Sequence, residues 1–119
     1  MKAYVAAPFG RKVEARAAIQ TLAALGIEST ARWVESHYDD ETKPEILRLE
    51  AMEDLNDIDR ADMLVLLASW PREGSGGKDV ELGYALGRGK KVVVVGEPYS
   101  LFHYYPCVKV VASVGEIVS

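Results

Sequence analysis

The chain has 119 residues, 49% hydrophobic and 27% charged, values typical of one globular domain. The length excludes separate catalytic and cofactor domains, so we interpret residues 1–119 as one domain. The net charge of −4 disfavours a general nucleic-acid-binding surface. Ten acidic and three basic residues give residues 39–62 a charge of −7, so the remainder carries +3 and is compatible with a local site for a small anion.

The residue types that mark secretion, membranes and metal sites are scarce. Cys107 is the only cysteine, which excludes an internal disulfide and a cysteine zinc cluster. His37 and His103 are the only imidazoles and have no suitably spaced partner, so we expect no metal and no cofactor. No stretch approaches the roughly 20 apolar residues of a membrane span, and no secretory signal is visible. We expect a cytoplasmic protein without membrane contact.

Apolar runs alternate with helical patterns along the chain. Short apolar runs predict strands at residues 3–7, 27–34, 63–68, 92–95 and 108–111. Periodic apolar spacing, a proline suited to a first helical turn at position 44 and a glycine stop at position 26 predict helices at 11–25, 44–60 and 79–88. Such alternation favours a parallel sheet with helices on both faces. We predict a three-layer α/β fold of the flavodoxin or Rossmann type, with a five-stranded sheet in the order 2-1-3-4-5.

The predicted strand order reverses between the first and third strands. Ligands of such sheets bind outside the carboxyl ends of the strands at this point. The loops expected around the site are 8–11, 35–43 and 69–78, with 96–106 beside them.

Two carboxylates are candidates for chemistry in this place. Glu81 follows the glycine loop 74–77 in the first turn of a predicted helix, where an acid also simply complements the helix dipole. Asp54 falls within the apolar stripe of the preceding helix, and a carboxylate facing a core must be paired, capped or exposed in a cleft. The stripe also contains hydrophobic residues at the start of that helix. The helix's other acids fall mostly off the stripe or on its margin and are predicted to be solvated: Glu50, Glu53, Asp57 and Asp59.

A pair of carboxylates in one cleft suits glycosidic chemistry, with one as nucleophile and the other handling protons. Candidate ligands for an anion are the backbone amides of 8–11 and 74–77 and the hydroxyl of Ser75. The glycine patterns of dinucleotide-binding and P-loop proteins are absent.

Three blocks of the sequence resemble a known family, the nucleoside 2-deoxyribosyltransferases and the related 2′-deoxynucleoside 5′-phosphate N-hydrolases. Residues 4–9 (YVAAPF) look like the family's opening strand and turn, with Ala7 in place of a glycine. Asp54 followed by residues 61–65 (ADMLV) resembles its helix aspartate and next strand. Residues 76–85 (GGKDVELGYA) resemble its glycine loop and the helix that carries its nucleophile.

The resemblance implies that Glu81 attacks C1′ of a deoxynucleoside or deoxynucleotide, and that Asp54 orients Glu81 or assists proton transfer. It also implies that Ser75 contacts the 5′-phosphate of the hydrolase branch. The remaining candidate substrate-binding residues are Tyr4, Pro8, Phe9, Gly10, Arg11, Gly76 and Gly77.

Aromatic residues supply further candidates. Family members form dimers in which a neighbour's loop closes the site, so His103 or Tyr104 is a candidate for action across subunits of a homodimer or higher oligomer. The alternative is that the aromatic loop packs over the sheet edge. His37 lies near the sequence position, after the second strand, at which the hydrolase branch carries a histidine. Trp33 and Trp70 either stack a base or pack in the core.

The sequence therefore predicts hydrolysis of the N-glycosidic bond of 2′-deoxynucleoside 5′-monophosphates, or of deoxynucleosides, through a covalent deoxyribosyl-glutamate. The short chain favours this branch over the transferases, which exchange bases and remain an alternative. A non-catalytic nucleotide-binding or sensing module is a second alternative. A phosphoribohydrolase acting on ribonucleotides is disfavoured because the pattern P-G-G-x-G-T-x-x-E is missing before Glu81.

Overall fold

The computed structural model describes residues 1–118, which form one five-stranded parallel sheet. The strand order is β2-β1-β3-β4-β5, as predicted. The strands are β1 (Lys2–Ala6), β2 (Glu28–Ser29), β3 (Met63–Leu67), β4 (Lys91–Val95) and β5 (Val108–Val111). The helices are α1 (Lys12–Ala24), α2 (Pro44–Asp59) and α3 (Gly77–Gly87), with short 3₁₀ turns η1 (Phe9–Arg11), η2 (Trp33–Glu35), η3 (Leu101–Tyr104) and η4 (Val114–Glu116).

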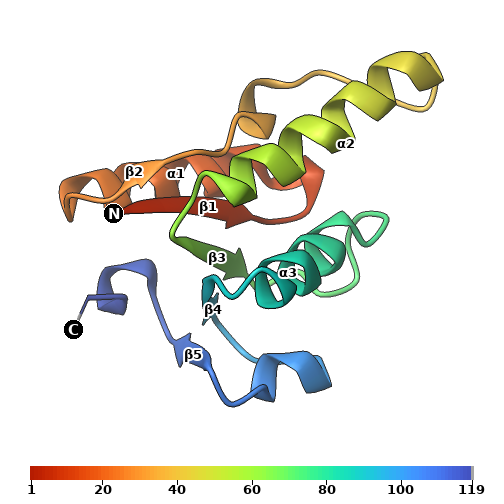
Figure 1. Cartoon of the computed structure of the whole chain (residues 1–119). Coiled ribbons are helices and arrows are strands. Elements are labelled where there is room, and N and C mark those ends of the chain that lie inside the picture. Colours follow the sequence, from red (N-terminus) through yellow and green to blue (C-terminus); the bar gives the residue numbers. More distant parts are fainter. Residues whose placement is uncertain (119) are drawn as a thin grey trace.

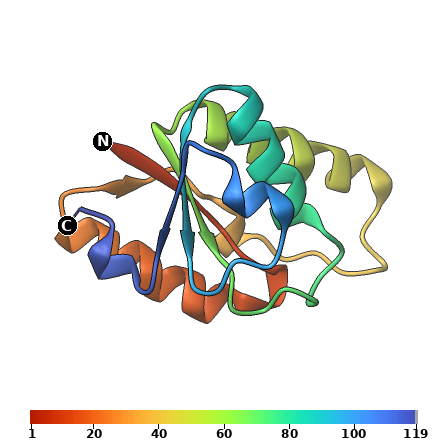
Figure 2. The same ribbon diagram turned by 90° about the horizontal axis from the view of Figure 1, so that it is seen from below.

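The helices form layers on both faces of the sheet. α1 and η4 cover one face, and α2 and α3 lie side by side over the other (Figures 1 and 2). Every residue of β3 is buried, as is all of β4 after Lys91, because both faces of the central strands are covered. The α/β three-layer prediction is therefore confirmed, and all four strand pairs are parallel.

β2 is much shorter than the predicted strand at 27–34, which was wrong beyond Ser29. Only Glu28 and Ser29 pair with β1. The chain then turns inward, and the indole Nε1 of Trp33 donates a hydrogen bond of 2.8 Å to the carbonyl oxygen of Val5. The Trp33 side chain thereby occupies an acceptor on the edge of β1 that a longer β2 would have used. The apolar residues of this segment pack as a buried turn instead of a strand.

The carboxyl-terminal half of α2 is held in place by acidic residues that the sequence pattern predicted to be exposed to solvent. Asp57 is fully buried, and its Oδ1 accepts from Arg32 (Nη2, 2.7 Å) and from Arg60 (2.7 Å). The backbone amide of Arg32 donates to Oδ2 at 3.1 Å. Asp59 accepts a hydrogen bond of 2.8 Å from Tyr84 of α3. The prediction that Asp57 is solvated was wrong, because two arginines, one of them distant in sequence, converge on it.

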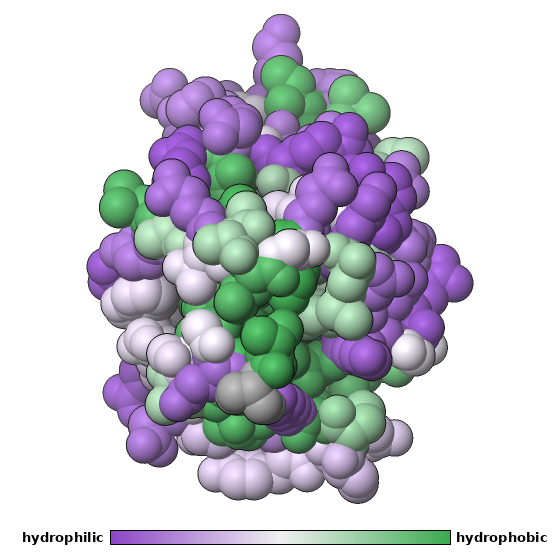
Figure 3. Space-filling view, turned by 90° about the vertical axis from the view of Figure 1, so that its left-hand side faces the viewer, coloured by the Kyte–Doolittle hydropathy of each residue, from purple (hydrophilic) through white to green (hydrophobic). Residues whose placement is uncertain are grey.

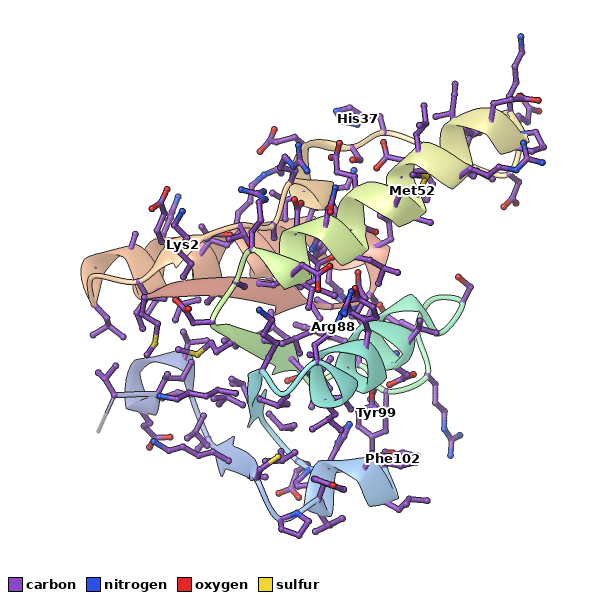
Figure 4. The ribbon with its side chains drawn as sticks, in the orientation of Figure 1. Lys2, His37, Met52, Arg88, Tyr99 and Phe102 are labelled. Carbon is purple, nitrogen blue, oxygen red and sulfur yellow. The ribbon has the colours of Figure 1, made fainter. Side chains whose placement is uncertain are left out.

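The amino-terminal half of α2 extends away from the sheet (Figure 1). The predicted apolar stripe is therefore exposed at this end, with Ile46 at 47% and Leu47 at 38% exposure. Met52 also points outward from the helix (Figure 4). Only the half of α2 that lies over the sheet obtains the burial that its pattern predicts.

No helix within residues 1–118 combines the length and apolar character needed to cross a membrane. The surface at the end of the molecule where the strands begin has a band of hydrophobic residues, with hydrophilic residues on either side of it (Figure 3).

Candidate active site

A cleft of about 140 Å³ lies at the carboxyl ends of β1 and β3, where the strand order reverses. Its walls come from four parts of the chain: the turn after β1, the segment around η2, the middle of α2, and the loop that leads into α3. The lining residues are Ala7, Pro8, Phe9, Trp33, Tyr38, Asp54, Glu73, Gly74, Ser75, Gly76, Gly77, Lys78 and Glu81. Residues 96–106 do not line it.

Glu81 projects into the cleft from the second turn of α3 and is held by the first strand. The hydroxyl of Tyr4 donates a hydrogen bond of 2.5 Å to Oε2 of Glu81. Tyr4 itself is fully buried and does not line the cleft. The structure therefore places Tyr4 as a support for Glu81 and not as a wall of the cleft.

Asp54 reaches the same cleft from α2. Its Oδ1 atom is buried and has no hydrogen-bond partner among residues 1–118. An acceptor in this condition carries a desolvation cost unless it holds a proton or meets a ligand. Asp54 is thus the acid of α2 that lines the cleft, consistent with its position in the apolar stripe.

Burial raises the pKa values of both carboxyl groups. The pKa of Asp54 rises to about 7, mainly through burial and then through the charge of Glu50. The pKa of Glu81 rises to about 8 through burial, against the lowering effect of the Tyr4 hydrogen bond. Both groups therefore keep a proton to a higher pH than free carboxyl groups do, and Glu81 keeps its proton to a higher pH than Asp54. Strongly raised pKa values inside a cleft mark Asp54 and Glu81 as candidate catalytic groups.

The loop before α3 is shaped by glycines and by a buried lysine. Gly74 and Gly76 have φ of +80° and +92°, which side chains beyond glycine rarely adopt. Lys78 is buried, and its Nζ donates long hydrogen bonds to the carbonyl oxygens of Pro71 (3.4 Å) and Glu73 (3.3 Å). The loop thus passes over the start of α3, with Ser75, Gly76 and Gly77 lining the cleft.

Gly10 and Arg11, predicted near the anion, lie outside the lining of the cleft. The Nε atom of Arg11 donates to Oε2 of Glu73 at 2.9 Å, and its Nη2 donates to Oε1 of the same carboxylate. The guanidinium also lies 4.5 Å from the ring centroid of Trp70. Trp70 supports Arg11 in this structure, and Glu73 stands between Arg11 and the cleft.

An aromatic wall stands opposite the glycine loop. The rings of Phe9 and Tyr38 stack with centroids 4.1 Å apart, and Trp33 lies 6.1 Å from Phe9. His37 is exposed on the segment before α2 and does not line the cleft (Figure 4). Its neighbour Tyr38 does, and only the direction of the backbone decides which of the two faces inward.

His103 and Tyr104 lie away from the cleft on η3. His103 is fully buried, and its Nδ1 accepts from the backbone amide of Tyr99 at 3.2 Å. Tyr99 extends toward α3, where its hydroxyl donates to Asp79 at 3.0 Å (Figure 4). Tyr104 is 71% exposed, and Phe102 is exposed beside it. The structure thus leaves Tyr104 exposed to solvent and packs His103 inside its own chain.

Tyr38, Glu73 and Lys78 are cleft residues that sequence reasoning missed. A lysine or glutamate beside a glycine loop carries no local signal of burial or pairing, although the loop itself was predicted to face the site. Within residues 1–118 no group of three histidine, cysteine or acidic side chains is arranged to hold a metal ion.

No protein-family model and no curated protein matches the sequence. The solved structures that share its fold include the following two. The CMP N-glycosidase BcmB of Clostridium botulinum has a TM-score of 0.62 and 19% identity, over 93% of this chain and 87% of that one. A 2-deoxyribosyltransferase of the psychrotolerant bacterium Bacillus psychrosaccharolyticus has a TM-score of 0.66 and 24% identity, over 85% of this chain and 78% of that one. The structural similarity predicted from the three sequence blocks is confirmed: this chain has the fold of an N-glycosidase and of a 2-deoxyribosyltransferase.

Proposed function

We propose that this protein cleaves the N-glycosidic bond of 2′-deoxynucleoside 5′-monophosphates, with water as the acceptor. The observation that carries the proposal is the pair of carboxyl groups, Glu81 and Asp54, that meet in one cleft with pKa values of about 8 and 7. The names of the two structural relatives add support, because one is a CMP N-glycosidase and the other a 2-deoxyribosyltransferase. The first name supports a 5′-monophosphate as substrate.

The proposed reaction has two steps. An oxygen of Glu81 forms a bond to C1′ while the bond from C1′ to the base nitrogen breaks, and the electron pair leaves with the base. In the reactive form of the pair Glu81 is ionised and Asp54 carries the proton, and Asp54 gives this proton to the departing base. Water then attacks C1′ of the deoxyribosyl ester, Asp54 takes the proton of that water, and Glu81 is released. Tyr4 binds Oε2 of Glu81 and so leaves the other carboxylate oxygen for the attack.

The loop at the start of α3 is the proposed binding place for the 5′-phosphate. The hydroxyl of Ser75 and the amides at the amino terminus of α3 lie in the cleft beside Glu81. The cleft volume of about 140 Å³ is small beside the roughly 300 Å³ or more of a typical ligand pocket. We therefore expect the base to extend past the cleft lining.

A homodimer or higher oligomer forms part of the proposal. Leu101, Phe102 and Tyr104 are 76%, 55% and 71% exposed on η3, a concentration of apolar and aromatic surface suited to an interface. Light scattering coupled to size-exclusion chromatography measures the assembly. A monomer at all concentrations would remove this part of the proposal.

The central experiment separates hydrolysis from transfer. The protein is incubated with deoxynucleosides, with their 5′-monophosphates and with the matching ribonucleotides, each with and without a second free base, and products are separated by chromatography. We expect release of base from deoxynucleoside monophosphates without an added base. Exchange only when a second base is present would indicate a transferase, the function in the name of one relative. No release from any substrate at high enzyme concentration would leave a nucleotide-binding module.

Glu81→Gln tests the nucleophile. Loss of the carboxylate removes the attacking oxygen, so we expect base release to fall by about 10³-fold or more. Glu97→Gln is the matched control, because Glu97 is exposed and does not line the cleft. Near-normal turnover by Glu81→Gln would overturn the assignment.

A further inference from the structure

One side of the cleft is bordered by an ion pair, Arg11 with Glu73, that the proposed reaction does not use. Arg11 binds both oxygens of Glu73 through two of its nitrogens. The pairing raises the pKa of Arg11 and lowers that of Glu73, chiefly through these hydrogen bonds. Glu73 lines the cleft and Arg11 does not. The carboxylate therefore lies between the guanidinium and the space that a ligand would enter.

The carboxylate of Glu73 accepts from two nitrogens of Arg11, which is also how a phosphate group binds an arginine. A guanidinium presents a planar fork of N–H donors that fits the oxygens of a carboxylate or of a phosphate equally well. Glu73 is two residues from Ser75, which lines the same cleft. A phosphate that enters beside Ser75 meets the negative charge of Glu73 before it reaches the guanidinium of Arg11.

The surroundings hold the backbone of this loop and leave the Glu73 side chain free to turn. The buried Lys78 binds the carbonyl oxygen of Glu73 at 3.3 Å, whereas the Glu73 side chain is 46% exposed. Arg11 is fixed independently, by Glu14 at 3.2 Å and by the ring of Trp70. The carboxylate can therefore leave while the guanidinium and the loop stay in place.

We propose that Glu73 is a specificity-determining residue that competes with the 5′-phosphate of the substrate for Arg11. The inference rests on the proposed function in taking a phosphate monoester as the ligand group. A phosphate dianion displaces the carboxylate and gains the guanidinium, whereas an uncharged 5′-hydroxyl leaves the pair intact. Glu73 thereby sets how strongly the phosphate contributes to substrate binding.

The first test uses inorganic phosphate, followed by the NMR shifts of the amides of residues 75–77. Glu73→Gln removes the competing charge, so we expect phosphate to bind about fivefold more tightly, the size of a good exposed ion pair. Arg11→Met removes the cation and weakens binding by at least a similar factor. Glu14→Gln is the matched control: Glu14 binds the same guanidinium but does not line the cleft, so its effect stays below twofold.

The second test uses kinetics with a deoxynucleoside monophosphate and the corresponding deoxynucleoside. In Glu73→Gln we expect KM for the monophosphate to fall relative to KM for the deoxynucleoside, by a factor similar to the gain in phosphate binding. Unchanged or weaker phosphate binding by Glu73→Gln overturns the proposal, as does an equal effect of Glu14→Gln. The phosphate titration measures binding and needs no turnover. An absence of base release would therefore count against the proposed enzyme activity, whereas unchanged phosphate binding by Glu73→Gln would count against the competition between Glu73 and phosphate.

Discussion

Asp54 and Asp57 lie three residues apart on α2, yet their surroundings differ sharply. Asp57 is fully buried, and both of its oxygens accept hydrogen bonds from Arg32 or Arg60. Asp54 borders the cleft, and its buried Oδ1 has no partner within residues 1–118. A satisfied carboxylate holds a structure together, whereas an unsatisfied one is available to a proton or a ligand.

The two sites depend on each other through the helix that carries them. The Asp57 ion pairs tie α2 to the segment after β2, and Asp59 ties its end to Tyr84 of α3. These contacts fix how α2 is rotated about its axis. Because residues three apart share a helix face, the same rotation that buries Asp57 turns Asp54 toward Glu81.

Asp54→Asn is expected to produce the largest effect in this comparison. The amide cannot give up a proton, so kcat/KM for base release should fall about 100-fold. Stability should stay the same or increase, because a buried ionisable group without a partner has been removed. Chemical denaturation and initial rates on the same preparation measure both. A loss of stability with full activity would reverse the assigned roles.

Asp57→Asn should show the opposite pattern. It weakens the charge-assisted hydrogen bonds from two arginines, which remain half-exposed and hydrated, so we expect a loss of about 2 kcal/mol in the free energy of unfolding. Activity of the folded fraction should change by less than about threefold. Urea denaturation measures the first quantity, and rates well below the melting temperature measure the second. A strong loss of activity at unchanged stability would place Asp57 in the chemistry.

Tyr4→Phe sharpens the comparison, because Tyr4 supports Glu81 much as Arg32 supports Asp57. Removal of the hydroxyl deletes the 2.5 Å hydrogen bond to Glu81. The pKa of Glu81 should then rise further, since that bond lowers it. We expect about a tenfold loss of kcat/KM at neutral pH, with partial recovery at higher pH. A uniform loss at every pH would indicate a packing defect instead.

The stability of the folded chain should also depend on pH through the two cleft acids. The pKa of Asp54 is about 7 in the folded chain against an ordinary value of 3.8, so the folded state holds this proton longer. Stability from this group should therefore be highest below about pH 4 and decline as the pH rises to about 7. Glu81, with a folded pKa of about 8, extends the decline. Asp54→Asn should flatten the slope of the urea midpoint against pH. A slope of unchanged size in this variant would exclude Asp54 as a source, because the contribution of Glu81 is the only part expected to remain.

Local patterns were sufficient to predict much of the fold and to select two acids that line the cleft. The all-apolar run of β3 and the alternation of strands and helices led to the sheet order, because handed crossovers leave few arrangements. Glu81 and Asp54 were selected as candidates because of their positions. Glu81 follows a glycine loop, and Asp54 is a carboxylate on an otherwise apolar stripe of its helix. Tyr4 was proposed as a substrate contact, and its support of Glu81 appeared only when β1 and α3 were seen together.

By itself, the sequence determined the parallel α/β architecture and the two acids of the cleft, since both depend on spacing within short segments. The tertiary structure alone decided that β2 ends at Ser29, that Asp57 is buried, and that Glu73 accepts the hydrogen bonds of the Arg11 guanidinium. Each of these depends on a partner from elsewhere in the chain: Val5 for Trp33, Arg32 for Asp57, and Arg11 for Glu73 itself. Periodicity reports which face of a segment is apolar, but the partner of a charge or a hydrogen-bond donor is set by how distant segments pack.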